Sequence, residues 1–252
     1  MQREQGHRTS QRNMRTLDLP PPFRPVALRE VGDAFAHACA HAVELGAGTL
    51  VFVGRLDLAE FAVILEPEEP LATARRAFYV CMVALSDALA GRAPPEKPMV
   101  IEWPGAIYVD GGLVGGGRLG WPDRSEEDAV PDWLVFGAAI RIAFPSREEP
   151  GLHPGSTALT EEGFDEVGSE RLAESFARHL MVVVNRWRED GFAAIAREYI
   201  AKIEPENGVA RDINENGDLS IWRAGRPTEY RKLLLASTAP SWLDPKTGGP
   251  RL

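Results

Sequence analysis

The sequence predicts an α+β fold, in which helices pack on a mixed, mostly antiparallel sheet and a small β domain follows. Three observations support this prediction. Segments with the apolar period of a helix alternate with short apolar strands. Asp-Gly and Asn-Gly dipeptides, which favour two-residue hairpin turns, separate strand-like segments and indicate antiparallel pairs. The chain has 252 residues, of which 44% are hydrophobic, and this is enough to bury a sizeable core.

The composition excludes several classes of protein. The net charge of −9 repels a nucleic-acid backbone, so we expect no nucleic-acid partner. No apolar run approaches the roughly 18 residues that cross a bilayer, and the N-terminus has no secretory signal. Cys39 and Cys81 lie in patterns typical of buried helix faces, which does not indicate a disulfide framework. We therefore expect a cytoplasmic protein without a membrane partner.

The first half of the chain is predicted to contain two helices and two strands. Residues 1–25 are polar and then proline-rich, and we expect them to be disordered or extended, with translation starting at Met1 or Met14. The elements that follow are a helix over 28–45 that Gly46 ends, strands over 49–53 and 61–65, and a helix over 70–91.

The second half begins with short strands and ends in a small β unit. Strands over 99–102, 107–109 and 113–114 surround the Asp110-Gly111 turn, and a long buried strand covers 132–144. A Pro- and Gly-rich loop over 145–160, helices over 169–190 and 192–203, and β structure over 208–235 with a turn at Asn216-Gly217 complete the order. The predicted domains are 26–204 and 205–238, followed by an irregular tail over 239–252.

Two motifs are compatible with a metal ion, but each has a simpler explanation. His37, His41 and Glu44 have a spacing that could bind a metal from one helix face, and equally the spacing of an exposed helix face. Residues 212–220 imitate the first nine positions of an EF-hand loop, but Arg223 stands where the bidentate carboxylate is needed. A hairpin explains the same residues, so we expect no metal site.

The densest glycine cluster of the chain is Gly115, Gly116 and Gly117, followed by Arg118. One interpretation is that exposed backbone N–H groups bind an anion there. The other is a strand thinned by glycine for tight packing. The sequence leaves both interpretations open.

Residues 102–108 read Glu-Trp-Pro-Gly-Ala-Ile-Tyr and are followed by the Asp110-Gly111 turn. This stretch resembles the signature segment of biotin protein ligases and lipoate ligases, which reads Lys-Trp-Pro-Asn-Asp-Ile/Leu-Tyr, then a turn, then Arg-Lys-x-x-Gly. Residues 135–141 resemble the Ile-Gly-x-Gly-Ile-Asn strand of the same family. The order of the elements is also similar, so the resemblance covers roughly residues 26–236.

The resemblance implies a fold, a chemistry and partners. The fold has a mixed sheet with helices and a small SH3-like C-terminal domain. The chemistry is the activation of biotin, lipoate or octanoate by ATP as an acyl-adenylate, and then the transfer of the acyl group to a lysine of a carrier-protein domain. A lysine between the carboxylate and the phosphate offsets the developing charge in such enzymes.

This sequence departs from the family pattern where the chemistry needs it. Leu113 aligns with the motif lysine, and no other lysine lies between Lys97 and Lys202. The Asn-Asp pair is replaced by Gly105-Ala106, and the ligand loop is shortened to residues 54–60. Removing one charge-stabilising donor typically costs about 10²–10³ in rate. We therefore expect reduced or lost ligase activity, as in a pseudoenzyme, and assign no catalytic residue.

The remaining cations could still bind a ligand. Arg55, Arg118 and Arg141 could converge on one cleft and bind an anion, or they could form salt bridges with the acidic surface. With them, the predicted ligand-binding residues are Trp103, Gly115, Gly116 and Gly117.

Three functions remain open. The first is a protein that binds a carboxylic acid or a nucleotide, with ATP and biotin or lipoate suggested by the resemblance alone. The second is an active, divergent ligase or acyltransferase that modifies a carrier-protein lysine. The third is a non-catalytic interaction protein.

Overall fold

The computed structural model describes residues 17–144, 153–165 and 167–252, and the main unit is a seven-stranded sheet. The strand order is β1-β2-β3-β7-β6-β5-β4, and every neighbouring pair is antiparallel except the parallel pair β1-β2. The strands are β1 (Arg24–Leu28), β2 (Thr49–Val53), β3 (Leu58–Leu65), β4 (Met99–Glu102), β5 (Ala106–Val109), β6 (Gly112–Gly120) and β7 (Leu134–Arg141). The predicted α+β fold with a mixed, mostly antiparallel sheet is confirmed.

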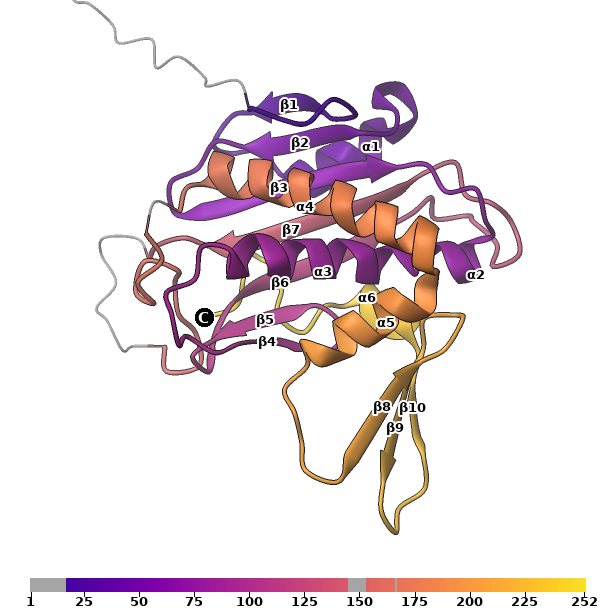
Figure 1. The fold of residues 1–252 in the computed structure, drawn as a ribbon. Coiled ribbons are helices and arrows are strands. Elements are labelled where there is room, and N and C mark those ends of the chain that lie inside the picture. The colour runs from indigo at the N-terminus through magenta and orange to yellow at the C-terminus, as the bar shows by residue number, and fades with distance from the viewer. Residues whose placement is uncertain (1–16, 145–152, 166) are drawn as a thin grey trace, which may run out of the picture.

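Helices cover the two faces of this sheet unequally (Figure 1). One face is covered by α3 (Ala77–Ala90), α4 (Ser169–Asp190) and α5 (Phe192–Ala201). The other face carries α1 (Ala34–Leu45) over β2, β3 and β7, and residues 239–252 beside it. The short helices α2 (Leu71–Ala74) and α6 (Leu233–Thr238) lie in connections.

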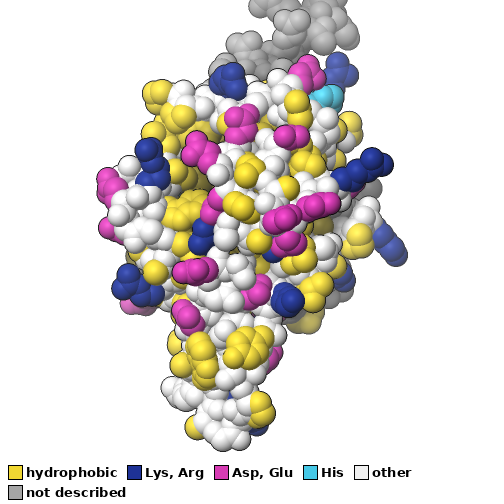
Figure 2. Space-filling model, turned by 90° about the vertical axis from the view of Figure 1, so that its right-hand side faces the viewer, with side chains coloured by type: hydrophobic (Ala, Val, Ile, Leu, Met, Phe, Trp, Pro, Cys, Tyr) yellow, Lys and Arg dark blue, Asp and Glu magenta, His cyan; other side chains and the backbone are white. Residues whose placement is uncertain are grey.

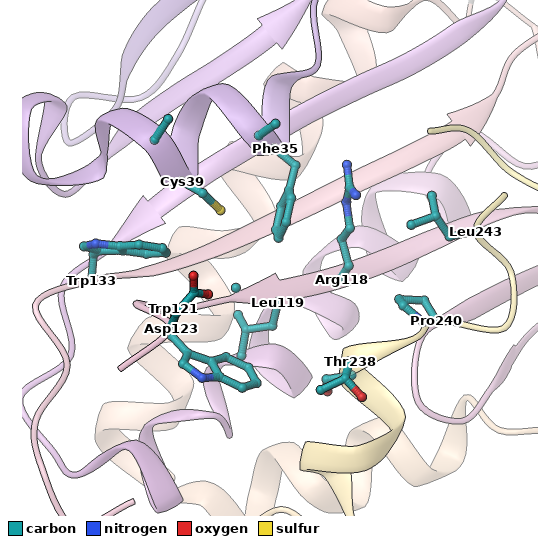
Figure 3. A pocket seen from close by; sticks show the side chains of 14 residues that line it. Phe35, Cys39, Arg118, Leu119, Trp121, Asp123, Trp133, Thr238, Pro240 and Leu243 are labelled. Carbon is teal, nitrogen blue, oxygen red and sulfur yellow. The ribbon is translucent and has the colours of Figure 1, made fainter. Parts of the chain in front are cut away.

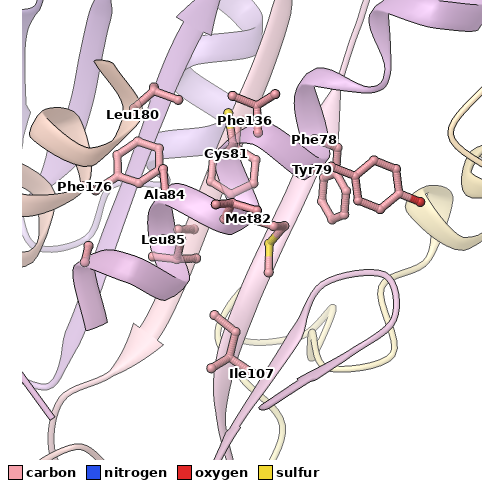
Figure 4. Packing of buried hydrophobic residues seen from close by; sticks show 14 of the residues in the cluster. Phe78, Tyr79, Cys81, Met82, Ala84, Leu85, Ile107, Phe136, Phe176 and Leu180 are labelled. Carbon is pink, nitrogen blue, oxygen red and sulfur yellow. The ribbon is translucent and has the colours of Figure 1, made fainter. Parts of the chain in front are cut away.

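The main core lies between the sheet and the helices α3 and α4 (Figure 4). Phe78 and Met82 of α3 face the sheet, where they meet Phe136 of β7. The ring of Phe136 stacks on Phe176 of α4, with centroids 5.7 Å apart. Helix α3 is buried on nearly all sides, and all its residues except Ser86 and Asp87 are apolar, so it has no continuous polar face.

The face under α1 has a smaller core made of short side chains. Ala34, Ala38 and Ala42 of α1 pack against valines and other apolar residues of β2, β3 and β7. Asp33 caps the helix, since its side chain accepts a hydrogen bond from the N–H of Ala36 at 2.8 Å. Alanines let the helix lie close to the sheet, and this fixes the position of its N-terminus.

A second, three-stranded antiparallel sheet projects from the body (Figures 1 and 2). Its strands are β8 (Val209–Ile213), β9 (Leu219–Arg223) and β10 (Glu229–Arg231). At the turn, the side chain of Asn214 accepts hydrogen bonds from the N–H groups of Asn216 and Asp218, and Gly217 has a φ of 80°. The hairpin interpretation of residues 212–220 is therefore confirmed.

Several predicted boundaries were wrong. The first helix begins at residue 34 and not at 28, because residues 24–28 pair with β2 as an edge strand, where a proline is tolerated. The helix predicted over 70–91 is divided into α2 and α3. The pair predicted over 113–114 is the start of the nine-residue strand β6, and residues 233–238 are helical and not β. The other predicted elements agree to within a few residues.

The remaining predictions concern a hairpin turn, two segments outside the described residues, the domain boundaries and the membrane. The Asp110-Gly111 turn is confirmed, with φ of 49° and 81° at its two residues. Residues 1–16 of the predicted N-terminal segment and residues 145–152 of the predicted loop lie outside the described residues. The domain boundaries at 204 and 238 remain predictions. In the described part of the chain, no helix combines the length and the apolar character needed to span a membrane.

Candidate ligand site

The candidate site lies on the α1 side of the sheet, where β3, β6 and β7 present alternate side chains. Glu60 of β3 pairs with Ala139, Arg118 of β6 pairs with Gly137, and Arg141 of β7 pairs with Leu58. Directly paired residues point to the same face of a sheet. The β7 residues 137, 139 and 141 are two apart, so they also share a face, and Glu60, Arg118 and Arg141 therefore lie on one side of the sheet.

A pocket of about 720 Å³ opens on this side between α1 and residues 237–243 (Figure 3). Arg118 lies in the pocket, and the other walls are largely aromatic or apolar. The lining residues are Phe35, Ala36, Cys39, Ala40, Arg118, Leu119, Gly120, Trp121, Asp123, Trp133, Ser237, Thr238, Pro240 and Leu243. The charged groups in the lining are the guanidinium of Arg118 and the carboxylate of Asp123. The guanidinium and the rings suit an anion with an apolar body, bound at the Arg118 end of the pocket.

Arg118 is held in a fixed position by α1. Its guanidinium carbon lies 4.1 Å from the ring centroid of Phe35, and its Nη2 lies 3.4 Å from the Oδ1 of Asp33. The Arg118 side chain is 16% exposed, and burial lowers the pKa of its guanidinium. An arginine stays charged even when its pKa is lowered, so a mostly buried cation faces the pocket.

Two glycines of the sheet make room for Phe35. A Cβ on Gly137 would lie 2.5 Å from the Phe35 ring, and a Cβ on Gly120 would lie 2.8 Å from it. Gly137 and Gly120 therefore leave the space that holds the ring on which Arg118 lies.

A buried carboxylate supports the N-terminus of α1 beside the pocket. Glu60 is 5% exposed, and its Oε1 accepts a hydrogen bond of 2.8 Å from the N–H of Ala34. Burial raises the pKa of Glu60, whereas the Ala34 N–H lowers it. The sequence analysis placed Glu60 in the shortened ligand loop over 54–60, which was wrong at its end, because residues 58–60 belong to β3.

Cys39 is the thiol that lines the pocket. Burial raises the pKa of this thiol to about 11, against the opposing effect of Arg118. The sulfur is therefore protonated at neutral pH and is a poor nucleophile. Both Cys39 and Cys81 are free, in agreement with the sequence.

Arg55 lies in the connection between β2 and β3 and is paired with its own loop. Its Nε and Nη2 donate to the two carboxylate oxygens of Asp57 at 3.1 and 2.9 Å. This pair lowers the pKa of the Asp57 carboxyl. Arg55 does not line the pocket at Arg118.

Arg141 is 6% exposed and donates to backbone carbonyls. Its guanidinium reaches the carbonyl oxygens of Pro250 at 2.8 Å, Arg251 at 3.0 Å and Thr157 at 3.3 Å. Residues 250 and 251 therefore cover Arg141 in this structure. The three arginines share one region of the fold, but each has its own protein partners.

Leu113, which the sequence resemblance aligns with the motif lysine, lies in an apolar cluster. It is 7% exposed and clusters with Leu58, Ala106, Ala139 and Trp242. The indole N–H of Trp242 donates to the carbonyl oxygen of Gly117 at 3.2 Å. The sequence analysis missed Trp242, because it treated residues 239–252 as irregular, although a Trp-Leu pair in such a tail was a signal for docking.

The glycine cluster in β6 is tightly packed. A Cβ on Gly115 would lie 2.0 Å from the carbonyl oxygen of Ala139, and one on Gly116 would lie 2.6 Å from the Trp242 indole. A Cβ on Gly117 would lie 2.5 Å from the sulfur of Met82. Close packing thus explains all three glycines in this structure.

Trp103 lies in a different part of the molecule from the Arg118 pocket. Its Nε1 donates to the Oη of Tyr79 at 2.9 Å, and that hydroxyl donates to the carbonyl oxygen of Gly217 at 2.6 Å. The motif tryptophan therefore helps to connect α3 with the small sheet.

The described residues contain no group of three or more His, Cys, Asp or Glu side chains that could hold a metal ion. The rings of His37 and His41 lie 4.5 Å apart, and His41 faces Glu44 at 3.5 Å on the exposed side of α1.

The fold and the motif segment define a protein of the biotin and lipoate ligase class. The family model described as the biotin/lipoate A/B protein ligase family matches residues 19–201, and the chain belongs to this family. No match is found among curated proteins.

Solved structures give the same fold. A biotin protein ligase-like protein of unknown function from Silicibacter sp. TM1040 is 31% identical, with a TM-score of 0.74, over 87% of this chain and 98% of that chain. The biotin protein ligase from Aquifex aeolicus in complex with biotin and ATP is 16% identical, with a TM-score of 0.60, over 83% and 99% of the two chains. The enzyme from Leishmania major in complex with biotinyl-5-AMP is 15% identical, with a TM-score of 0.55, over 84% and 98%.

Proposed function

We propose that this protein binds a small carboxylic acid or a nucleotide in the pocket at Arg118, and that its ligase activity is reduced or lost. The observation that carries the proposal is the environment of Leu113. Where the family motif has a lysine, the isobutyl group of Leu113 is buried in the apolar cluster that also contains Trp242. No ammonium group stands at that place to offset the charge between a carboxylate and a phosphate.

The nearby cations do not replace that lysine. Lys97 lies beside the hairpin turn, and its Nζ is bonded to Asp110 and Glu162, each at 2.8 Å. The guanidinium of Arg141 is turned toward backbone carbonyls. A rigid guanidinium also presents a geometry different from that of an ammonium group.

The pocket itself favours binding of an acid. Arg118 offers donors for a carboxylate, and Phe35, Trp121 and Trp133 offer apolar surface for the body of the molecule. The names of the Aquifex and Leishmania structures report biotin, ATP and biotinyl-5-AMP as ligands of those proteins. They support a cyclic or chain-like acid, or its nucleotide derivative, as the class of ligand.

Thermal unfolding in the presence of ligand tests this proposal. Biotin, lipoate, octanoate and ATP are each added in large excess, and a ligand at 100 times its Kd adds about 2.7 kcal/mol of stability. We expect at least one of them to raise the Tm. Biotin methyl ester, which lacks the carboxylate, is the matched control for biotin. A Tm that none of the four compounds changes contradicts the proposal.

A further inference from the structure

Residues 239–252, which we call the strap, cross the α1 side of the sheet beside the pocket (Figure 1). The strap folds back on itself: Leu243 and Pro250 form an antiparallel bridge, and the N–H of Arg251 donates to the carbonyl of Trp242 at 2.8 Å. Its shape is therefore maintained partly by its own hydrogen bonds.

Two attachments connect the strap to the sheet. Trp242 is 2% exposed, and its ring fills the space that the absent Cβ of Gly116 leaves open. The second attachment is Arg141, which donates to the carbonyls of Pro250 and Arg251 at 2.8 and 3.0 Å. Through these two attachments, the strap contacts or covers four residues of the sheet, which are Leu113, Gly116, Gly117 and Arg141.

The strap and the open pocket are adjacent. Pro240 and Leu243 of the strap form one wall of the pocket that contains Arg118 (Figure 3). Trp242, the neighbour of Leu243, lies over the glycine strand β6. If the strap leaves, the pocket therefore continues along β6 and β7 from Arg118 toward Arg141.

We propose that the strap is an autoinhibitory segment that competes with an acidic ligand for this side of the sheet. The proposal rests on the proposed function, since it regulates the same site. When the strap is closed, Trp242 occupies the groove over Gly116, and two carbonyls accept from Arg141. When it is open, an acid that enters at Arg118 can extend along the glycine strand and place an anionic group at Arg141.

When the strap opens, Arg141 exchanges the carbonyls of Pro250 and Arg251 for an anionic group of the ligand, and this exchange favours the ligand. A carboxylate or phosphate carries a full negative charge and can accept two parallel hydrogen bonds from a guanidinium, whereas a backbone carbonyl is neutral and cannot form an ion pair. The ligand must also replace the buried indole. If the strap is closed in about nine of ten molecules or more, opening it lowers the apparent Kd about ten-fold or more.

Calorimetric titration of the full chain tests this inference. Biotin, lipoate and octanoate are titrated into the wild type, Trp242→Ala and Trp222→Ala. Trp222, which is 41% exposed on the small sheet, provides a matched control. We expect Trp242→Ala to bind at least one acid about ten-fold more tightly than the wild type or more, and Trp222→Ala to bind like the wild type.

Hydrogen–deuterium exchange on the wild type provides a second readout that needs no variant. A saturating acid should increase exchange in peptides that cover residues 239–252. If Trp242→Ala does not fold, the exchange measurement on the wild type tests the strap proposal by itself. The strap proposal is overturned if folded Trp242→Ala binds the acids no more tightly than the wild type, or if acid slows the exchange of the strap. In either case the proposed function stands. Binding of none of the acids to either protein overturns the strap proposal, and it overturns the proposed function as well if ATP also leaves the Tm unchanged.

Discussion

The guanidinium carbon of Arg118 lies 4.1 Å above the ring centroid of Phe35, and both side chains line the same pocket. Phe35 is seated on Gly137, and Asp33 restrains the guanidinium from the N-terminus of α1. The cation is thus in place before a ligand arrives. Such preorganisation lowers the entropic cost of binding an anion.

Replacing Arg118 removes the charge that the pocket offers. A hydrogen bond to a charged group is worth about 1.5–3 kcal/mol, so we expect Arg118→Gln to weaken acid binding about 10- to 100-fold. Calorimetric titration with the acid that gives the largest Tm increase measures this. The control is Arg124→Gln, at an exposed position outside the pocket. Unchanged affinity in Arg118→Gln would place the acid elsewhere.

Restoring the motif lysine should not restore the enzyme. Leu113 is buried in the apolar cluster that contains Trp242, so Leu113→Lys places an ammonium among apolar side chains and costs about 3 kcal/mol or more of unfolding free energy. Leu56→Lys, at a position that is 74% exposed, should change stability by less than about 0.5 kcal/mol. Urea denaturation compares the two. A Leu113→Lys protein as stable as the wild type contradicts the described packing.

The hydrogen bond from Trp103 to Tyr79 predicts a structural role for the motif tryptophan. Trp103→Phe removes the indole donor, and we expect a loss of about 1–2 kcal/mol of unfolding free energy with unchanged acid affinity. Trp222→Phe on the exposed face of the small sheet is the control. Weaker acid binding in a folded Trp103→Phe protein would instead support its predicted place in the ligand site.

Glu60 predicts a specific pH dependence. Burial raises its pKa, so the folded protein binds this proton more tightly than the unfolded chain does. Its contribution to stability must then increase as the pH falls from neutral toward the ordinary carboxyl pKa of about 4.3. Glu60→Gln does not titrate, and its side-chain oxygen can still accept from Ala34. The free energy of unfolding of the wild type minus that of Glu60→Gln, measured by urea denaturation, should increase as the pH falls. A difference that stays constant or decreases contradicts this prediction.

Most of the fold could be predicted from local sequence signals. The Asp110-Gly111 turn, the amphipathic α4 and the buried β7 each have a pattern that their own residues determine. The edge strand β1 could not be predicted in this way. It exists because it pairs with β2 across 24 residues of chain, and its proline suggests a loop.

The site was predicted less completely, for a related reason. Arg118 was identified because it follows a conspicuous glycine cluster. Arg55 pairs with Asp57 in its own loop, whereas the partners of Arg141 lie in distant segments. Arg141 meets residues more than 100 positions away. The role of Trp242 depends on the same long-range packing, which no local pattern reveals.

The central claim is that the site has lost the means to activate an acid. Acid-dependent exchange of labelled pyrophosphate into ATP, measured on the purified wild type with Mg²⁺ and each of biotin, lipoate and octanoate, tests it most directly. We expect the rate with acid to equal the rate without acid. Exchange that rises above this blank with any of the three acids would show that an acyl-adenylate forms without the motif lysine, and would contradict the claim.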